Sequence, residues 1–349
     1  MQFFWFLPTH GDGEYLGRTD AARHGFPYYL KIAKCLDTLG YGGILIPIGP
    51  MFEEPWVYAA ALASHTVNLK YLVAVHPSYF SPAYIARQVA SFDRMSKGRI
   101  MLNIVVGGNQ VDLNNDGVFL SSEERYQQAD EFLQIYKALM TGGHADFRGK
   151  YYSLGKTELN FEAYQERLPP LYSAGTSEAG LELAARHVDC YIMWADPVDI
   201  VARRIDDLRK RAMQFGRSIR FGIRVHFIVR ETESLAWETA KRLMSQLSEQ
   251  EVQRAIRRFE AEESSAQKIS FALHQGDVGR LEIAPNLWAG VSLARGGALT
   301  ALVGDPETIQ KRLREYEAAG VDLVIGSATP HLEEAEVVYK YIIQPSLDN

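Results

Sequence analysis

The sequence predicts an α/β protein in which eight parallel strands close into a barrel. Two observations lead to this fold class: eight short apolar or β-branched runs occur along the chain, and segments with helical periodicity separate them in regular alternation. A doubly wound open sheet is the rival, but eight β/α units in 349 residues favour closure. The expected strands are Phe3–Leu7, Gly43–Pro47, Leu69–His76, Ile100–Val106, Leu171–Ser173, Cys190–Trp194, Phe221–Val229 and Leu323–Gly326.

Helical patterns fill the intervals between these strands. Many of them begin at or just after Ser, Thr, Asp or Pro, the residues that favour helix starts. The expected helices are Pro27–Leu39, Pro82–Met95, Ser122–Met140, Glu178–Arg186, Pro197–Phe215, Glu233–Gln246 and Pro306–Ala319.

Two segments exceed a plain barrel. Residues 107–120 are rich in Gly, Asn and Asp, and we expect a polar loop there, after the fourth strand. Residues 248–304 separate the seventh and eighth strands and contain two helical patterns and a glycine-rich stretch, at Gln250–Ser264, Ala266–His274 and Ala289–Ala298. Because an insertion after a barrel strand lies on the active face, we expect one domain over residues 1–349 with a lid at about 248–304.

Composition excludes several classes of function. A formal net charge of −6 without a basic stripe argues against nucleic acid or an anionic membrane as the main partner. Cys35 and Cys190 fall in a predicted helix and a predicted strand, as reduced thiols do. The apolar start, Met1–Pro8, is too short for a signal peptide or a membrane span, so we expect a cytoplasmic protein.

The most informative stretch is Phe221–Val229, an apolar run that carries Arg224 and His226. Side chains alternate across a strand, so these two point to the same face. An unpaired buried guanidinium costs several kcal/mol, so an anionic or polar group should meet it. Trp194 and Arg295, at a strand end and in a Gly-flanked loop, could complete one pocket. The alternative is a buried acid beside Arg224 and a structural role for His226.

A second candidate site follows the fifth strand. Residues Leu171–Glu178 run through Ala-Gly into a helix that opens with Thr176 and Ser177. Free backbone N–H groups and two hydroxyls at a helix start suit a phosphate, although an ordinary helix cap is the alternative. Tyr126 could bring a phenol to the same phosphate, and Asn103 needs a polar partner within its apolar strand, such as the edge of a heterocycle.

Other motifs are absent or incomplete. The histidines lack metal-ligand spacing and the chain has no Cys cluster or Gly-x-Ser-x-Gly elbow, so we expect no metal and little support for hydrolysis. The glycines around His10–Gly13 have the wrong spacing for a dinucleotide loop, and we interpret this stretch as a polar turn.

Taken together, these stretches resemble the bacterial alkanesulfonate monooxygenases, two-component flavoproteins of the bacterial luciferase-like superfamily. The resemblance implies a (β/α)8 TIM barrel that receives FMN as FMNH2 from a separate NAD(P)H-dependent flavin reductase. It also implies O2-dependent cleavage of a C–S bond to sulfite and an aldehyde, and a homodimer or homotetramer. The motifs that carry it are Phe4–Gly13, Arg87-Gln88, Asp93-Arg94, Gly98-Arg99, Asp116–Leu120, Arg125-Tyr126, Phe221–His226, Pro285–Gly290, Arg295–Gly297 and Pro330–Glu334.

The resemblance also assigns roles to residues. Two arginines would hold the sulfonate, because forked donors match its oxygens, and one of them, Arg295, would also hold the lid closed. The catalytic group comprises His226, Arg295, Arg224 and Trp194. The further substrate-binding residues are His10, Phe52, Thr329 and His331. The implied FMN-binding residues are Asn103, Tyr126, Ser173, Gly175, Thr176 and Ser177.

Two positions depart from the family pattern. Phe52 stands where the alkanesulfonate enzymes carry a cysteine, and Thr329 where they carry a tyrosine. Both changes reshape the expected pocket, so the substrate could be a simple alkanesulfonate, methanesulfonate or a sulfosugar such as sulfoquinovose. A reduced-flavin monooxygenase for a non-sulfonate such as a sulfone, and a non-catalytic flavin-binding protein, are the alternatives.

Overall fold

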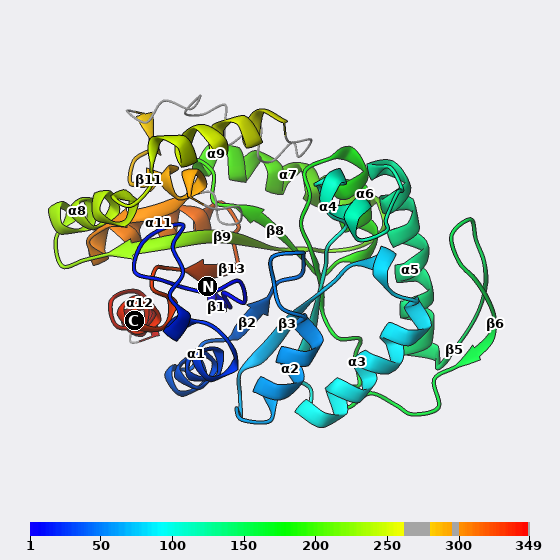
Figure 1. Cartoon of the computed structure of the whole chain (residues 1–349). Helices are drawn as coiled ribbons and strands as arrows, with labels where there is room; N and C mark the ends of the chain where they lie inside the picture. The colour runs from blue at the N-terminus through cyan, green and yellow to red at the C-terminus, as the bar shows by residue number, and fades with distance from the viewer. Residues whose placement is uncertain (262–279, 295–299, 348–349) are drawn as a thin grey trace.

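The computed structural model describes residues 1–261, 280–294 and 300–347 and contains a closed barrel of eight parallel strands (Figure 1). Each strand pairs with the next around the barrel, and the last pairs with the first, which confirms the expected fold class. All eight expected strands are present with small shifts at their ends. In order they are β1 (Gln2–Phe6), β2 (Gly43–Ile46), β3 (Lys70–Val75), β4 (Ile100–Ile104), β7 (Leu171–Ser173), β8 (Cys190–Trp194), β9 (Arg220–Val229) and β13 (Leu323–Ser327).

Helices surround the barrel, and each of the seven expected helices is present. None of the described helices is long and apolar enough to cross a membrane. Both cysteines are free thiols, as expected. The seven helices are α1 (Phe26–Leu39), α3 (Pro82–Ser96), α5 (Ser122–Gly142), α6 (Glu178–His187), α7 (Val198–Gln214), α8 (Glu233–Met244) and α11 (Pro306–Ala318).

The sequence did not indicate two further helices of the barrel, α2 (Pro55–Ala63) and α12 (His331–Val338). Helix α2 is apolar along almost its whole length, so it lacks the one-sided pattern from which an amphipathic helix is recognised. Its start is fixed by Glu54, whose carboxylate accepts the N–H of Val57 at 2.8 Å. The loop between the end of β2 and the start of α2 therefore lies at the rim of the barrel.

The two insertions differ in part from expectation. Residues 107–120 are not only loop, because α4 (Gln110–Asn115) lies within them, capped by the side chain of Asn109. Six residues are too few to show helical periodicity in a sequence. In the second insertion, α9 (Glu249–Ala261) confirms the described part of the expected Gln250–Ser264 helix. Residues 262–264 and the expected Ala266–His274 helix lie outside the described residues.

Several strands were missed. A separate hairpin, β5 (His144–Arg148) with β6 (Ser153–Glu158), projects from the body of the molecule (Figure 1). Three short strands, β10 (Glu282–Ala284), β11 (Leu287–Trp288) and β12 (Ala301–Gly304), extend the main sheet beside β9. Strands this short carry no alternation that distinguishes them from loops.

Strand β9 has ten residues and pairs with three strands, with β13 along one edge and with β8 and then β12 along the other. Its first part closes the barrel, pairing Arg224 with Trp194 of β8 and with Ile325 of β13. Its last part pairs with β12, beginning at His226 and Ala301. The strand therefore extends beyond the barrel rim, and Arg224 and His226 lie at the level where the barrel ends.

Alternation along the strands separates a packed interior from a polar rim. Ten mainly apolar side chains fill the barrel: Phe4, Phe6, Leu45, Leu72, Met101, Tyr172, Cys190, Ile192, Leu323 and Ile325. The same alternation directs Asn103, Trp194, Arg224 and His226 inward, nearer the carboxyl ends of their strands. Because all eight strands run in one direction, these residues gather at a single rim.

A buried carboxylate fixes the segment that leads into β7. Asp93 of α3 is fully buried and accepts the backbone N–H groups of Tyr164 and Gln165, each at 2.7 Å, and the Gln165 side-chain amide at 2.7 Å. It thus replaces backbone partners that this irregular segment does not find elsewhere.

We predict that Asp93→Ala lowers the free energy of unfolding by about 2–4 kcal/mol, because it leaves two backbone donors unsatisfied at about 1–3 kcal/mol each. Thermal melting followed by circular dichroism measures the loss. Asp199→Ala is the control, since it removes a carboxylate from an exposed ion pair with Arg203 and should leave the melting temperature nearly unchanged. Equal melting temperatures for the two variants would contradict the prediction.

Candidate active site

Arg224 lies between two aromatic rings at the barrel rim. Its guanidinium carbon is 4.0 Å from the centroid of the Phe6 ring and 5.4 Å from that of Trp194. Contacts of a cation with ring faces contribute roughly 0.5–2 kcal/mol each, more where water is excluded. The structure therefore brings the predicted Arg224 and Trp194 together and gives the positive charge apolar walls.

Three more predicted residues surround the same Phe6 ring. Its centroid lies 6.3 Å from that of His10, 6.2 Å from that of Phe52 and 6.1 Å from that of His331. His10 and Phe52 also meet edge to face, with centroids 5.3 Å apart. Three loops converge here, after β1, after β2 and after β13. We call Phe6, His10, Phe52, Trp194, Arg224 and His331 the rim cluster.

A buried hydrogen-bond network around Asp12 holds His331, one member of the rim cluster, in place. Asp12 accepts the His331 backbone N–H and the Tyr28 hydroxyl, both at 2.6 Å, and one of its oxygens lies 3.1 Å from Nδ1 of His331. Burial alone would raise the pKa of Asp12, but the charge and hydrogen bonds of His331 and Tyr28 outweigh it and hold that pKa well below its usual value. The turn at His10–Gly13 is polar, as expected, but Asp12 within it is buried.

Sequence reasoning missed Asp12 and Tyr28 as parts of the site. Asp12 and His331 are 319 positions apart, so no local spacing could connect them. The only signal was an acid between two glycines in the turn that follows a buried strand.

His226 is fully buried beside β13. Its Nδ1 lies 3.1 Å from Oγ of Ser327, the residue that the sheet register places opposite it. This contact fixes the orientation of the imidazole ring. Thr329 is also buried, two residues past the end of β13. Arg295, the second predicted arginine, lies outside the described residues.

The segment predicted to bind a phosphate lies at the start of α6. A Cβ on Gly175 would lie 2.7 Å from the hydroxyl of Tyr126, and one on Gly180 would lie 2.9 Å from it. Ser177 caps the helix by accepting the Gly180 N–H at 3.2 Å, and Tyr191 donates to the Gly175 carbonyl at 2.6 Å. Tyr126, from α5, therefore stands over a glycine-lined helix start, as the sequence led us to expect.

Two further predicted residues present buried polar atoms. Within the part of the chain that the structure describes, Oγ of Ser173 and Oδ1 of Asn103 have no hydrogen-bond partner. Asn103 faces the barrel interior, as Tyr172 opposite it does, so Ser173 faces the surrounding helices. Thr176 is half-buried between Gly175 and Ser177. The glycine-lined helix start has the chemistry to hold a phosphate such as that of FMN, and the orphaned oxygen of Asn103 has the chemistry to meet the edge of a heterocycle.

A histidine at the end of β3 was not among the predicted residues. His76 is buried, accepts the Ser78 N–H at 3.2 Å and stacks on Tyr79 with ring centroids 4.3 Å apart. Burial lowers the pKa of His76 to about 4, so its imidazole is neutral at pH 7. The hydroxyl of Tyr79 in turn donates a hydrogen bond to a carboxylate oxygen of Asp116, at 2.8 Å.

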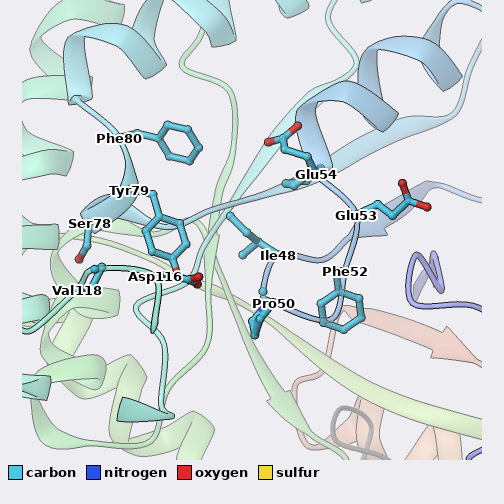
Figure 2. Close-up of a pocket in the computed structure, with 13 residues that line it drawn as sticks. Ile48, Pro50, Phe52, Glu53, Glu54, Ser78, Tyr79, Phe80, Asp116 and Val118 are labelled. Carbon is cyan, nitrogen blue, oxygen red and sulfur yellow. The ribbon is translucent and has the colours of Figure 1, made fainter. Parts of the chain in front are cut away.

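A pocket of about 550 Å³ opens beside the rim cluster (Figure 2). The loops after β2, β3 and β4 form its walls, and Phe52 belongs both to this pocket and to the rim cluster. We call it the rim pocket. Its lining residues are Ile48, Gly49, Pro50, Phe52, Glu53, Glu54, Pro55, Ser78, Tyr79, Phe80, Asp116, Gly117 and Val118. Among the described residues, no three His, Cys, Asp or Glu side chains gather in a way that could hold a metal ion.

Solved structures of several oxygenases share this fold. EDTA monooxygenase from Chelativorans sp. BNC1 is 17% identical, with 99% of this chain and 93% of that chain covered and a TM-score of 0.79. A long-chain alkane monooxygenase is 21% identical, with coverages of 100% and 91% and a TM-score of 0.78. The oxygenating constituent of 3,6-diketocamphane monooxygenase from Pseudomonas putida, solved with FMN, is 18% identical, with coverages of 98% and 95% and a TM-score of 0.70.

The sequence itself matches a family over most of its length. Residues 1–323 match the family described as luciferase-like monooxygenase. At identities of 17–21% the solved structures establish the shared fold, and the family match adds the sequence relationship. The protein, with its closed eight-stranded barrel, belongs to the luciferase-like monooxygenase family.

Proposed function

We propose that the protein is a two-component, FMNH2- and O2-dependent monooxygenase that cleaves the C–S bond of an organosulfonate. The observation that carries the proposal is Arg224, a guanidinium directed into an apolar rim between Phe6 and Trp194. A sulfonate is a permanent anion with three acceptor oxygens, and a guanidinium offers it paired, charge-assisted donors. The aromatic walls suit the carbon chain that the sulfonate carries.

The geometry at the start of α6 supports a flavin-binding role for this part of the barrel. Tyr126 and the backbone around Gly175 and Ser177 would hold the FMN phosphate, and Asn103 would meet the ring system. Bound as FMNH2, the cofactor would supply the two electrons and two hydrogens that O2 needs. A separate NAD(P)H-dependent reductase would provide it. A homodimer or homotetramer remains part of this proposal.

The atoms of the proposed reaction balance. The C–S bond of the sulfonate breaks and sulfur leaves as sulfite with the electron pair of that bond. One oxygen atom of O2 becomes the aldehyde oxygen and the other leaves in water. His226 would exchange a proton with the substrate, and its contact with Ser327 would keep the ring oriented for that role. Arg224 would hold the sulfonate until the bond has broken.

Substrate choice would depend on the rim cluster and its surroundings. Phe52 packs on His10 and Phe6. Thr329, two residues before His331 in the sequence, is buried. A phenyl ring and a short hydroxyl side chain make a differently shaped wall from a cysteine and a tyrosine. We therefore propose a sulfonate whose carbon part differs from a simple linear chain, with a sulfosugar and methanesulfonate as the first candidates.

Sulfite release tests the proposal directly. The purified protein is supplied with a flavin reductase, NADH, FMN, air and catalase, and offered methanesulfonate, octanesulfonate, taurine or sulfoquinovose. We expect sulfite above the enzyme-free control from at least one of them. No sulfite from any substrate, with FMNH2 binding intact, would contradict the proposal and favour a sulfone substrate or a flavin-binding role.

Arg224→Lys should lower kcat/KM for the sulfonate by about 10- to 100-fold, because a lost charge-assisted hydrogen bond costs about 1.5–3 kcal/mol. Arg224→Met should lower it further, since it removes the charge as well. Arg203→Lys, on the exposed face of α7, is the matched control and should behave like the wild type. For a neutral substrate such as a sulfone, the Arg224 variants would scarcely change kcat/KM, which would refute the sulfonate assignment.

Gly175→Ala should weaken FMNH2 binding by at least about tenfold, equivalent to roughly 1.4 kcal/mol. The new methyl group would stand 2.7 Å from the Tyr126 hydroxyl, at a backbone φ of +139° that side chains rarely adopt. Fluorescence titration with FMN and anaerobic titration with FMNH2 measure the change. Gly155→Ala, in the β5–β6 hairpin, meets no atom within 4 Å and should leave binding unchanged.

A further inference from the structure

Two buried histidines at the rim have different partners at Nδ1. Nδ1 of His226 lies 3.1 Å from the hydroxyl oxygen of Ser327, and Nδ1 of His331 lies 3.1 Å from a carboxylate oxygen of Asp12. A hydroxyl can donate or accept a hydrogen bond, so Ser327 leaves open which nitrogen of His226 carries the proton. An ionised carboxylate can only accept, so Asp12 is more restrictive for His331.

Asp12 is buried and held by donors at both of its oxygens. Oδ1 accepts the N–H of Gly13 at 2.9 Å, and Oδ2 accepts the Tyr28 hydroxyl and the His331 backbone N–H, both at 2.6 Å. Burial acts to raise the pKa of Asp12, but His331 and Tyr28 lower it more, and it stays well below its usual value. The carboxylate is therefore ionised at neutral pH.

The negative charge of Asp12 decides where the proton of His331 lies. A lone pair on Nδ1 would be repelled by the carboxylate oxygen 3.1 Å away, whereas an N–H at the same place is attracted to it. In a neutral imidazole only one nitrogen carries a proton. A proton held on Nδ1 therefore makes Nε2 the nitrogen at which the ring gains and loses protons.

The two acids that follow His331 in α12 pair with arginines. Glu333 lies 2.6 Å from Arg23, and Glu334 lies 2.7 Å from Arg230. Arg23 belongs to the segment between β1 and α1, and Arg230 directly follows β9, so two separate parts of the chain hold the start of α12. The backbone that carries the imidazole is thereby fixed.

His331 also lies in the same part of the rim as the guanidinium proposed to hold the substrate. The Phe6 ring is the shared neighbour, with its centroid 6.1 Å from that of His331 and 4.0 Å from the guanidinium carbon of Arg224. A proton released from a substrate at Arg224 would therefore be released near this imidazole.

We propose that Asp12 is a positioning residue for proton transfer at the rim: it keeps one proton of His331 on Nδ1, so that His331 exchanges protons with a substrate through Nε2. The role in turnover rests on the proposed function. That reaction converts a sulfonate, O2 and FMNH2 into an aldehyde, the sulfite dianion, FMN, water and one proton. The proton comes from the carbon that carried sulfur. Nε2 would accept it and pass it to water, in addition to the exchange proposed for His226, and Asp12 would stabilise the imidazolium that forms in between.

The position of the proton can be observed without substrate or flavin. Long-range proton–nitrogen NMR spectra of the protein made with isotope-labelled histidine distinguish a protonated ring nitrogen from an unprotonated one. The His331 signals are those that disappear in His331→Gln. We expect Nδ1 of His331 to be protonated throughout a pH titration and any change to occur at Nε2. An unprotonated Nδ1 in the wild-type protein would overturn the proposal.

Asp12→Asn should move this proton. The amide oxygen replaces Oδ2, which accepts two donors, and the new NH2 group then faces Nδ1 and favours a lone pair there. The proton of His331 should therefore pass to Nε2. Tyr28→Phe is the matched comparison, because it removes one donor from the same carboxylate but leaves the carboxylate able only to accept. In this variant His331 should keep its proton on Nδ1.

Steady-state sulfite release measures the effect on turnover. We expect Asp12→Asn to lower kcat by at least about tenfold and to change KM for the sulfonate little, since acid–base catalysis contributes roughly 10²–10⁴-fold. Asp199→Asn makes the same chemical change in an exposed ion pair with Arg203 on α7, and it should keep the wild-type kcat.

The outcomes separate this inference from the proposed function. A proton that stays on Nδ1 in Asp12→Asn, or that leaves it equally in Tyr28→Phe, would overturn the role given to the carboxylate. A moved proton with an unchanged kcat would overturn the role in proton transfer. Absence of sulfite from every sulfonate would overturn the proposed function. In that case, or if Asp12→Asn does not fold, the wild-type spectrum still decides where the proton of His331 lies.

Discussion

Both the barrel and its site depend on the pairing of strand β9. Its first residues complete the barrel between β8 and β13, and its last residues leave the barrel to pair with β12. Because side chains alternate along a strand, this pairing directs both Arg224 and His226 into the barrel. A slip of one residue in the pairing would turn both toward the surrounding helices. The hydroxyl of Thr300, which donates to the Ala195 carbonyl at 2.6 Å, joins the end of β8 to the start of β12.

The titratable side chains at the rim lie in apolar surroundings, where each is packed against rings, paired with an acid or kept neutral. Arg224 lies against rings, His331 pairs with buried Asp12, and His76 is kept neutral by burial. Electrostatic interactions are stronger where water is excluded, so a substrate anion would gain more from Arg224 here than on an open surface.

Part of the site could be foreseen and part could not. The alternation in Phe221–Val229 was enough to place Arg224 and His226 on one face. The Ala-Gly and Ser/Thr pattern after β7 was enough to expect a helix start there, and Tyr126 was a separate candidate for the same place. The contacts of Asp12 with His331, and of Phe6 with Arg224, join segments more than 200 residues apart, for which a single sequence carries no signal. The α4 helix and the short strands β10–β12 are stabilised by their neighbours, and their own residues show too few repeats to indicate a period.

The sequence alone determined the eight strands, most of the helices and the inward direction of the polar residues, because these follow from periodicity along neighbouring residues. Its motifs also determined the family. Only the tertiary structure decided which side chains meet at the rim, that a buried carboxylate supports His331, and that Phe52 belongs both to the rim cluster and to the rim pocket. The physical reason is that closing a barrel brings together the ends of all its strands, and those distances depend on the packing of the whole chain.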